Sequence, residues 1–103
     1  GEVYNIGTGI RKKNIDVAGS RAHLLNVPYN NIVQVKARPG HDRRYALDTA
    51  KIRKLGFEPQ VSFTNGLRLT VAWYKENEWW WRKIKSSKEF KLYYEKQYSS
   101  ISA

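Results

Sequence analysis

The feature that most constrains this chain is a turn set among basic residues, Arg38-Pro39-Gly40-His41-Asp42-Arg43-Arg44-Tyr45. Pro39 fixes its own φ and disfavours helix at Arg38, and Gly40 tolerates the positive φ that a sharp reversal requires. In this clamp octet, Arg38 is therefore expected to be extended and the chain to reverse at Gly40, so that the basic side chains sit at defined angles. Guanidinium groups held at defined angles suit bidentate contacts with phosphate oxygens, so the octet predicts an anion clamp.

The net charge favours an anionic partner but does not identify which kind. The 103 residues carry 19 Lys and Arg against 9 Asp and Glu, a formal net charge of +10. A nucleotide, a nucleic acid or an anionic membrane surface would each match this charge. The chain has no cysteine, which excludes disulfides and thiolate metal sites, and its two histidines are too few for a usual zinc site.

Length and patterning restrict the class further. The chain is long enough for one domain with a modest core. No apolar run approaches the roughly 18 residues of a membrane span, and no secretory signal is visible, so we expect a cytoplasmic protein without a membrane partner. The chain has no methionine and opens with the strand-like stretch Glu2-Val3-Tyr4-Asn5-Ile6, which predicts a piece of a larger protein.

The first half predicts short strands around one helix. Val3 to Ile6 and Ile32 to Val35 read as strands, and residues 43–47 after the turn read as extended. Between the two strands, apolar residues recur at helical spacing from about Ile15 to Leu25. Asn14 stands where its side-chain oxygen could cap that helix.

The second half predicts three helices: one ending near Lys54, one from Ser62 or Thr64 to Asn77, and one from Lys88 to Tyr98. The expected ends are Asp48 or Thr49 as the first cap, Gly56 as a left-handed terminator, and Ser86 as the last cap. Together these patterns predict an α/β domain over residues 1–98, with a few short strands and three to four helices. Residues 99–103 are expected to be a frayed tail.

Five stretches, in this order, carry a family resemblance: Val3-Tyr4-Asn5-Ile6-Gly7, Lys13-Asn14-Ile15-Asp16-Val17, the clamp octet with Ala46-Leu47-Asp48, Lys51-Ile52 followed by Leu55-Gly56-Phe57-Glu58-Pro59, and Gly66-Leu67 followed by Trp73-Tyr74. They resemble the C-terminal, nucleotide-sugar-binding part of the dTDP-glucose 4,6-dehydratases, which are extended short-chain dehydrogenases. The resemblance covers roughly Glu2 to Trp80. Because UDP-glucose 4,6-dehydratases share much of it, the choice between thymidine and uridine stays open.

The resemblance implies that the parent enzyme divides its chemistry between two parts of one polypeptide. Such a lyase converts dTDP-glucose to dTDP-4-keto-6-deoxyglucose in deoxysugar and rhamnose biosynthesis, by NAD-dependent oxidation, dehydration and reduction. An N-terminal Rossmann domain binds NAD and carries a Tyr-x-x-x-Lys pair. This chain contains neither that pair nor a Gly-x-Gly-x-x-Gly motif. We therefore expect no catalytic or cofactor-binding residue here, no activity in isolation, and the Rossmann domain as its partner.

The resemblance also assigns site residues. Asn14 and Arg38 correspond to positions that contact the substrate diphosphate, and His41 corresponds to a histidine of the same site near the nucleotide. Three further motif positions have no individual role: Arg43, Arg44 and Tyr45. From the residues alone, a helix N-terminus at Asn14 favours an anion. The alternatives are a solvated basic turn for Arg38 and His41 and a simple cap for Asn14.

Two other function classes stay open. The run Trp79-Trp80-Trp81 followed by Arg82 and Lys83 could stack bases, which would make the chain a small basic nucleic-acid-binding module. Such a run could equally pack the end of the chain onto its own domain. Alternatively, an apolar face could drive self-association in a non-catalytic interaction domain.

Overall fold

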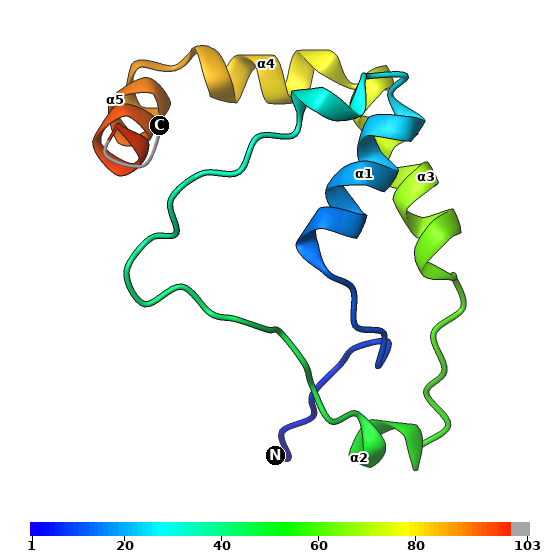
Figure 1. Ribbon diagram of the computed structural model, residues 1–103. Coiled ribbons are helices and arrows are strands. Elements are labelled where there is room, and N and C mark those ends of the chain that lie inside the picture. Colours follow the sequence, from blue (N-terminus) through cyan, green and yellow to red (C-terminus); the bar gives the residue numbers. More distant parts are fainter. Residues whose placement is uncertain (100–103) are drawn as a thin grey trace.

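In the computed structural model, residues 1–99 are described, and all secondary structure within them is helical. The elements are α1 (Asn14–Leu24), the 3-10 turn η1 (Tyr29–Asn31), α2 (Ala50–Arg53), α3 (Phe63–Glu76), α4 (Glu78–Ser86) and α5 (Lys88–Tyr98). Helices α1 and α3 lie side by side, α4 leads away from the end of α3, and α5 turns off its far end (Figure 1). Apart from Ser99, the predicted frayed tail lies outside the described residues.

The predicted α/β class is wrong, because residues 1–99 contain no strand. The segments expected as strands, Val3–Ile6 and Ile32–Val35, are irregular, as are residues 43–47. A helix closes its hydrogen bonds within its own segment, whereas a strand needs a second strand beside it. The chain between η1 and α2 instead runs in a wide arc that stands away from the helix pair (Figure 1). Strand-forming residues without a neighbouring strand therefore build no sheet.

Helix α1 begins one residue earlier than expected. Lys13, with an extended ψ of 142°, is its cap residue, and Asn14 is already helical. The carbonyl oxygen of Lys13 accepts from the amides of Asp16 and Val17, at 3.0 and 3.1 Å. The predicted capping role of Asn14 is therefore wrong, because the first turn closes on the preceding carbonyl.

The expected ends of α2 and α3 are confirmed. Asp48 Oδ1 accepts from the amide of Ala50 at 2.9 Å at the start of α2, and Gly56 has a φ of +87° after its end. Ser62 Oγ accepts from the amide of Asn65 at 3.2 Å and caps α3. These signals are local, so no distant partner was needed to predict them.

The C-terminal region contains one more helix than expected, because Trp79-Trp80-Trp81 lies within α4. The range of α5 is as predicted, but its cap is Ser87, whose Oγ accepts from the amide of Phe90 at 3.2 Å. Ser86 instead ends α4 and donates its hydroxyl to the carbonyl oxygen of Lys83 at 3.1 Å. Ser87 alone thus lies between the two helices.

The fold is open. Within residues 1–99 only Ala22 and Thr49 are buried, and side chains such as Leu55 and Trp79 remain more than two-thirds exposed, at 69% and 68%. The accessible surface is 9483 Å², whereas a folded monomer of this mass exposes about 6,000 Å². The radius of gyration is 17.3 Å, against about 13 Å for a compact chain of this length. The chain thus leaves uncovered much of the apolar surface that a closed domain would bury.

None of the helices within residues 1–99 is both long and apolar enough to span a membrane.

Candidate functional site

The predicted reversal in the clamp octet is present. The amide of His41 donates to the carbonyl oxygen of Arg38 at 3.3 Å, and Gly40 has a φ of +67°. Pro39 at the second position and a left-handed residue at the third are the requirements of a type II turn. Both Arg38 and His41 are exposed at this turn.

Beside the turn lies a basic hollow of about 830 Å³ between two stretches of chain. One wall is the basic loop before α1, and the other is the chain that follows the turn. Its lining residues are Arg11, Lys12, Lys13, Asn14, Asp42, Arg43, Arg44 and Tyr45. The structure therefore brings Asn14 together with Arg43, Arg44 and Tyr45, but Arg38 and His41 do not line this hollow.

The lining of the basic hollow is predominantly cationic. Five cationic side chains line it against a single carboxylate, that of Asp42. Asn14 is the first residue of an eleven-residue helix, so the positive end of the helix dipole adds to the same potential. Sequence reasoning did not assign Arg11, Lys12 and Lys13 to the site, although three consecutive basic residues directly before a helix start were a usable signal.

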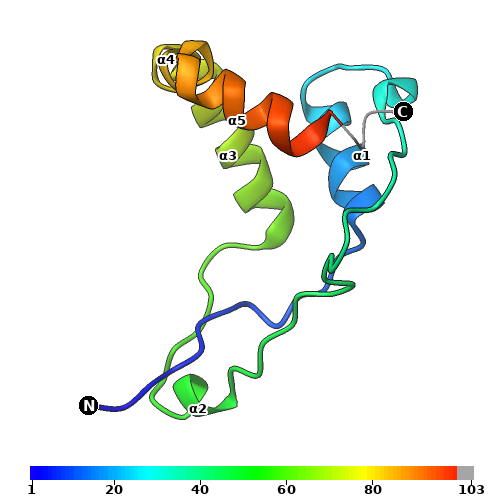
Figure 2. The ribbon, with the colours of Figure 1, turned by 90° about the vertical axis from the view of Figure 1, so that its left-hand side faces the viewer.

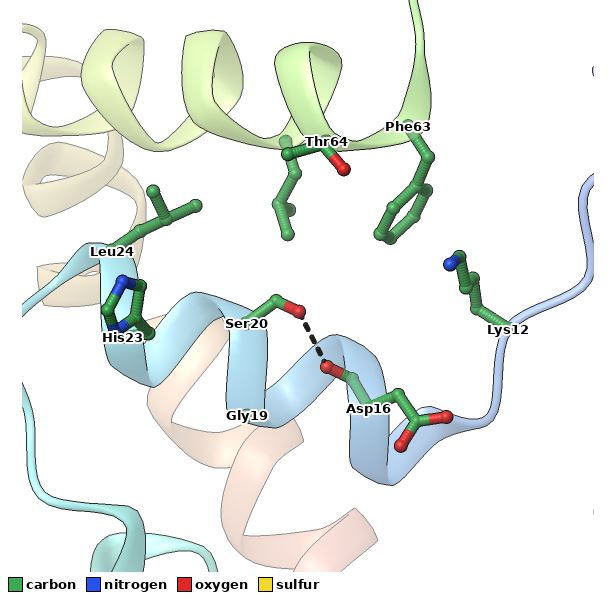
Figure 3. Close-up of a pocket in the computed structure, with 9 residues that line it drawn as sticks. Lys12, Asp16, Gly19, Ser20, His23, Leu24, Phe63 and Thr64 are labelled. Carbon is green, nitrogen blue, oxygen red and sulfur yellow. Dashed lines mark hydrogen bonds between the residues drawn. The ribbon is translucent and has the colours of Figure 1, made fainter.

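A second hollow of about 420 Å³ lies between α1 and α3 (Figure 3). Lys12 lines both hollows, and its ammonium points toward Phe63 of α3, 5.3 Å from the ring centroid. On the α1 side of this hollow, the Ser20 hydroxyl donates to the carbonyl oxygen of Asp16, one turn earlier in the same helix, at 2.8 Å. The contact of Lys12 with Phe63 thus joins the basic hollow to α3.

Lys51 of α2 holds the N-terminal segment near the site. Its ammonium donates to the carbonyl oxygen of Val3 at 2.9 Å, lies 3.7 Å from the Glu2 carboxylate and sits 4.6 Å from the Tyr4 ring centroid. Tyr4 donates its hydroxyl to Glu2 at 2.8 Å. That hydrogen bond, and then desolvation, raise the pKa of Tyr4 above its usual 10.0. The segment that leads to the basic loop is therefore tied to α2.

The tryptophan run does not form a stacking platform. Successive helical side chains point about 100° apart, so three consecutive residues of α4 cannot share one face. The Trp81 indole donates to the carbonyl oxygen of Tyr74 at 2.8 Å, and Arg82 and Lys85 lie over its ring at 4.9 and 5.7 Å. Trp80 meets Trp73 edge to face at 5.5 Å. Trp80 and Trp81 thus pack the start of α4 onto the end of α3, the alternative to base stacking, whereas Trp79 stays exposed at 68%.

Comparison with known proteins gives a consistent result, although no family model matches the chain. The chain is 46% identical over 90 residues to a dTDP-glucose 4,6-dehydratase of Streptomyces niveus, covering 86% of this chain and 27% of that protein. It is 49% identical over 94 residues to an Escherichia coli dTDP-glucose 4,6-dehydratase, covering 84% and 26%. A crystal structure of dTDP-glucose 4,6-dehydratase from Bacillus anthracis str. Ames in complex with NAD matches with a TM-score of 0.73 and 40% identity, covering 80% of this chain and 26% of that one.

The fold and these relatives define a segment of a nucleotide-sugar dehydratase. As the sequence resemblance predicted, the chain matches the dTDP-glucose 4,6-dehydratases as a fragment of such an enzyme, and it spans about a quarter of the length of the relatives that it matches. None of these relatives supports the nucleic-acid-binding alternative.

The residues of this chain do not fit NAD, which the Bacillus anthracis enzyme binds. Gly7-Thr8-Gly9 has no third glycine, and no strand precedes it. The residues that follow are the basic loop, and α1 begins only at Asn14. A dinucleotide site needs a glycine-rich turn directly between a strand and a helix. No reaction step is therefore assigned to this chain through the cofactor.

Proposed function

We propose that this chain is the substrate-binding part of a dTDP-glucose 4,6-dehydratase and holds the diphosphate of dTDP-glucose in the basic hollow. The parent enzyme would convert this nucleotide sugar to dTDP-4-keto-6-deoxyglucose by NAD-dependent oxidation, dehydration and reduction. The observation that carries the proposal is that Asn14 and Arg44 line the same cationic hollow in a chain 40–49% identical to such enzymes over most of its length.

The proposed roles are binding and orientation. Arg43 and Arg44 offer forked donors that match two phosphate oxygens each, and the Asn14 amide and the Tyr45 hydroxyl add neutral donors. None of these side chains acts on the sugar carbons in this proposal, so their loss would weaken substrate binding more than turnover.

Arg38 and His41 are proposed as two further contacts, Arg38 to the substrate diphosphate and His41 near the nucleotide. What supports this is their position on the hydrogen-bonded turn that leads into the Arg43–Tyr45 wall, with both side chains exposed. The turn stands on the arc between η1 and α2, which lacks regular structure. In the proposal, the rest of the enzyme holds the arc against the bound nucleotide.

We propose that the N-terminal Rossmann domain of the parent enzyme covers the open faces of this chain. The support is the accessible surface of 9483 Å², about half as much again as a folded monomer of this mass exposes. The competing idea is a non-catalytic interaction domain that self-associates through the same apolar surface. Strictly monomeric sedimentation of this chain across protein concentrations would argue against that idea. The cytoplasmic location stays a prediction.

The decisive experiment titrates dTDP into the full-length enzyme by calorimetry. We expect Arg44→Ala to weaken dTDP binding about tenfold or more, because a charge-assisted hydrogen-bond pair is lost. Arg68→Ala is the matched control, since Arg68 is an exposed arginine on α3 outside both hollows. Equal dTDP affinity in wild type and Arg44→Ala, or an equal loss in both variants, would contradict the proposal.

A further inference from the structure

We propose that Arg53 is the positioning residue of the basic hollow: it sets the separation of the two walls without touching the ligand. This inference rests on the proposed function, because it explains how the same site keeps its shape. Arg53 belongs to α2, and neither hollow described above includes it.

The evidence begins with two hydrogen bonds from one guanidinium. Arg53 Nη2 donates to the carbonyl oxygen of Thr8 at 3.0 Å, and Arg53 Nε donates to Thr49 Oγ1 at 3.0 Å. Because the guanidinium is planar and rigid, two bonds from different nitrogens fix the positions of both acceptors relative to each other. Arg53 therefore connects the N-terminal segment with the segment that enters α2.

Close packing at the same place supports this connection. Thr49 is only 6% exposed, one of the two buried residues within 1–99. A Cβ added at Gly7 would lie 3.5 Å from Thr49 Cγ2 and 3.7 Å from Leu47 Cδ1. Gly9 has a φ of +77°, and a Cβ there would lie 3.8 Å from Arg53 Nη2. The two segments thus cross at van der Waals distance, with the guanidinium at the crossing.

The crossing lies just outside both walls of the basic hollow. Thr8 stands three residues before Arg11, where one wall begins, and Thr49 stands four residues after Tyr45, where the other ends. No strand pairing within residues 1–99 fixes the distance between these walls. Both views show the N-terminal segment beside α2, below the helix pair (Figures 1 and 2). The bonds of Arg53 are therefore the contacts best placed to set the width of the hollow.

The geometry requires arginine at this position. A lysine ammonium is a compact charge on a flexible stem and could reach one acceptor at a time, so it would not lock both segments together. The neighbouring Lys54 is exposed and lies outside both hollows. Lys54→Ala thus offers a matched control from the same end of α2.

The test measures dTDP affinity and steady-state kinetics with dTDP-glucose in the full-length enzyme carrying Arg53→Ala, Arg53→Lys or Lys54→Ala. We expect Arg53→Ala to raise both the dTDP Kd and the KM about tenfold, with kcat within about twofold, because misplaced walls weaken binding. Arg53→Lys should recover part of the loss, and Lys54→Ala should match wild type. A merely structural role would lower Tm while leaving the dTDP Kd of the folded enzyme unchanged, and this result would overturn the proposal.

Two further outcomes separate the proposals. If wild type fails to bind dTDP, the proposed function fails, and the positioning role fails with it. If Arg44→Ala weakens binding but Arg53→Ala does not, only the positioning role is overturned. Should Arg53→Ala fail to fold, Thr49→Val removes the acceptor while keeping the volume: weakened dTDP binding supports the role, and unchanged binding overturns it.

Discussion

The Lys12 ammonium lies 5.3 Å from the centroid of the Phe63 ring, and this contact joins the basic loop before α1 to the first residue of α3. The two residues are fifty-one positions apart in the sequence. A cation above an aromatic face is attracted by the ring quadrupole, by about 0.5–1 kcal/mol at exposed sites. Lys12 is thereby held at the edge of the basic hollow rather than left to sample solvent.

Removing the ring should loosen Lys12. Phe63→Leu keeps an apolar side chain but removes the π face, so we expect dTDP affinity in the full-length enzyme to fall about two- to threefold. Lys12→Met should weaken binding more, because the charge itself is lost. In the double variant the Phe63 change should add nothing further. Additive losses would show that the ring acts independently of Lys12.

Removing the one carboxylate of the hollow should strengthen anion binding. We expect Asp42→Asn to tighten dTDP binding about threefold at low ionic strength, because a repulsive charge is removed from an otherwise cationic lining. The gain should shrink in 0.5 M salt, since screening weakens exposed charges. Glu58→Gln, an exposed acidic residue outside the hollow, serves as the control. A loss of affinity in Asp42→Asn would contradict this account of the electrostatics.

The turn should depend on the glycine at its third position. Gly40 has a φ of +67°, so Gly40→Ala places a Cβ in a left-handed conformation at a cost of about 1–2 kcal/mol. We expect the KM for dTDP-glucose to rise, as the turn shifts and misplaces Arg38. The control is Gly66→Ala in α3, where a Cβ would meet Val61 at an ordinary 3.6 Å. Replacing this helical glycine should stabilise α3 by about 0.5–1 kcal/mol.

The proposed contact of Arg38 with the substrate can be tested by comparison with Lys36, a basic residue on the same arc. We expect Arg38→Ala to raise the KM for dTDP-glucose about tenfold, through loss of a charged hydrogen bond to the substrate diphosphate. Lys36→Ala removes the same charge two residues earlier and should change the KM less than twofold. Similar losses in both variants would mean that Arg38 contributes only to the general positive potential.

The junction between α4 and α5 allows a test of the observed cap. Ser87→Ala removes the acceptor for the Phe90 amide and should cost about 1 kcal/mol of local stability, whereas Ser86→Ala should have little effect on α5. Amide hydrogen exchange at Phe90 measures this directly. Faster exchange of the Phe90 amide in Ser86→Ala than in Ser87→Ala would show that Ser86 caps α5, as the sequence alone predicted.

Local signals predicted much of the helical structure. The Pro39-Gly40 turn, the Ser62 cap and the range of α5 are close to what their own neighbours dictate, because turns, caps and helical hydrogen bonds join residues a few positions apart. Errors of one residue, at Asn14 and at Ser86, arose where two adjacent residues could both start a helix. Helix α4 was missed although its residues follow an amphipathic pattern, because its three consecutive tryptophans were interpreted as a base-stacking or packing run rather than as part of a helix.

What the sequence determined by itself was therefore the chemistry and the local shape: a strongly basic chain, a turn among arginines, and the resemblance to the dTDP-glucose 4,6-dehydratases. Tertiary structure alone decided that the expected strands stay unpaired and that Asn14 shares a hollow with Arg44 rather than with Arg38 and His41. It also decided that Arg53 reaches Thr8 across forty-five residues. The physical reason is the same in each case: such contacts join residues distant in the sequence, and the path of the whole chain selects them rather than local propensity.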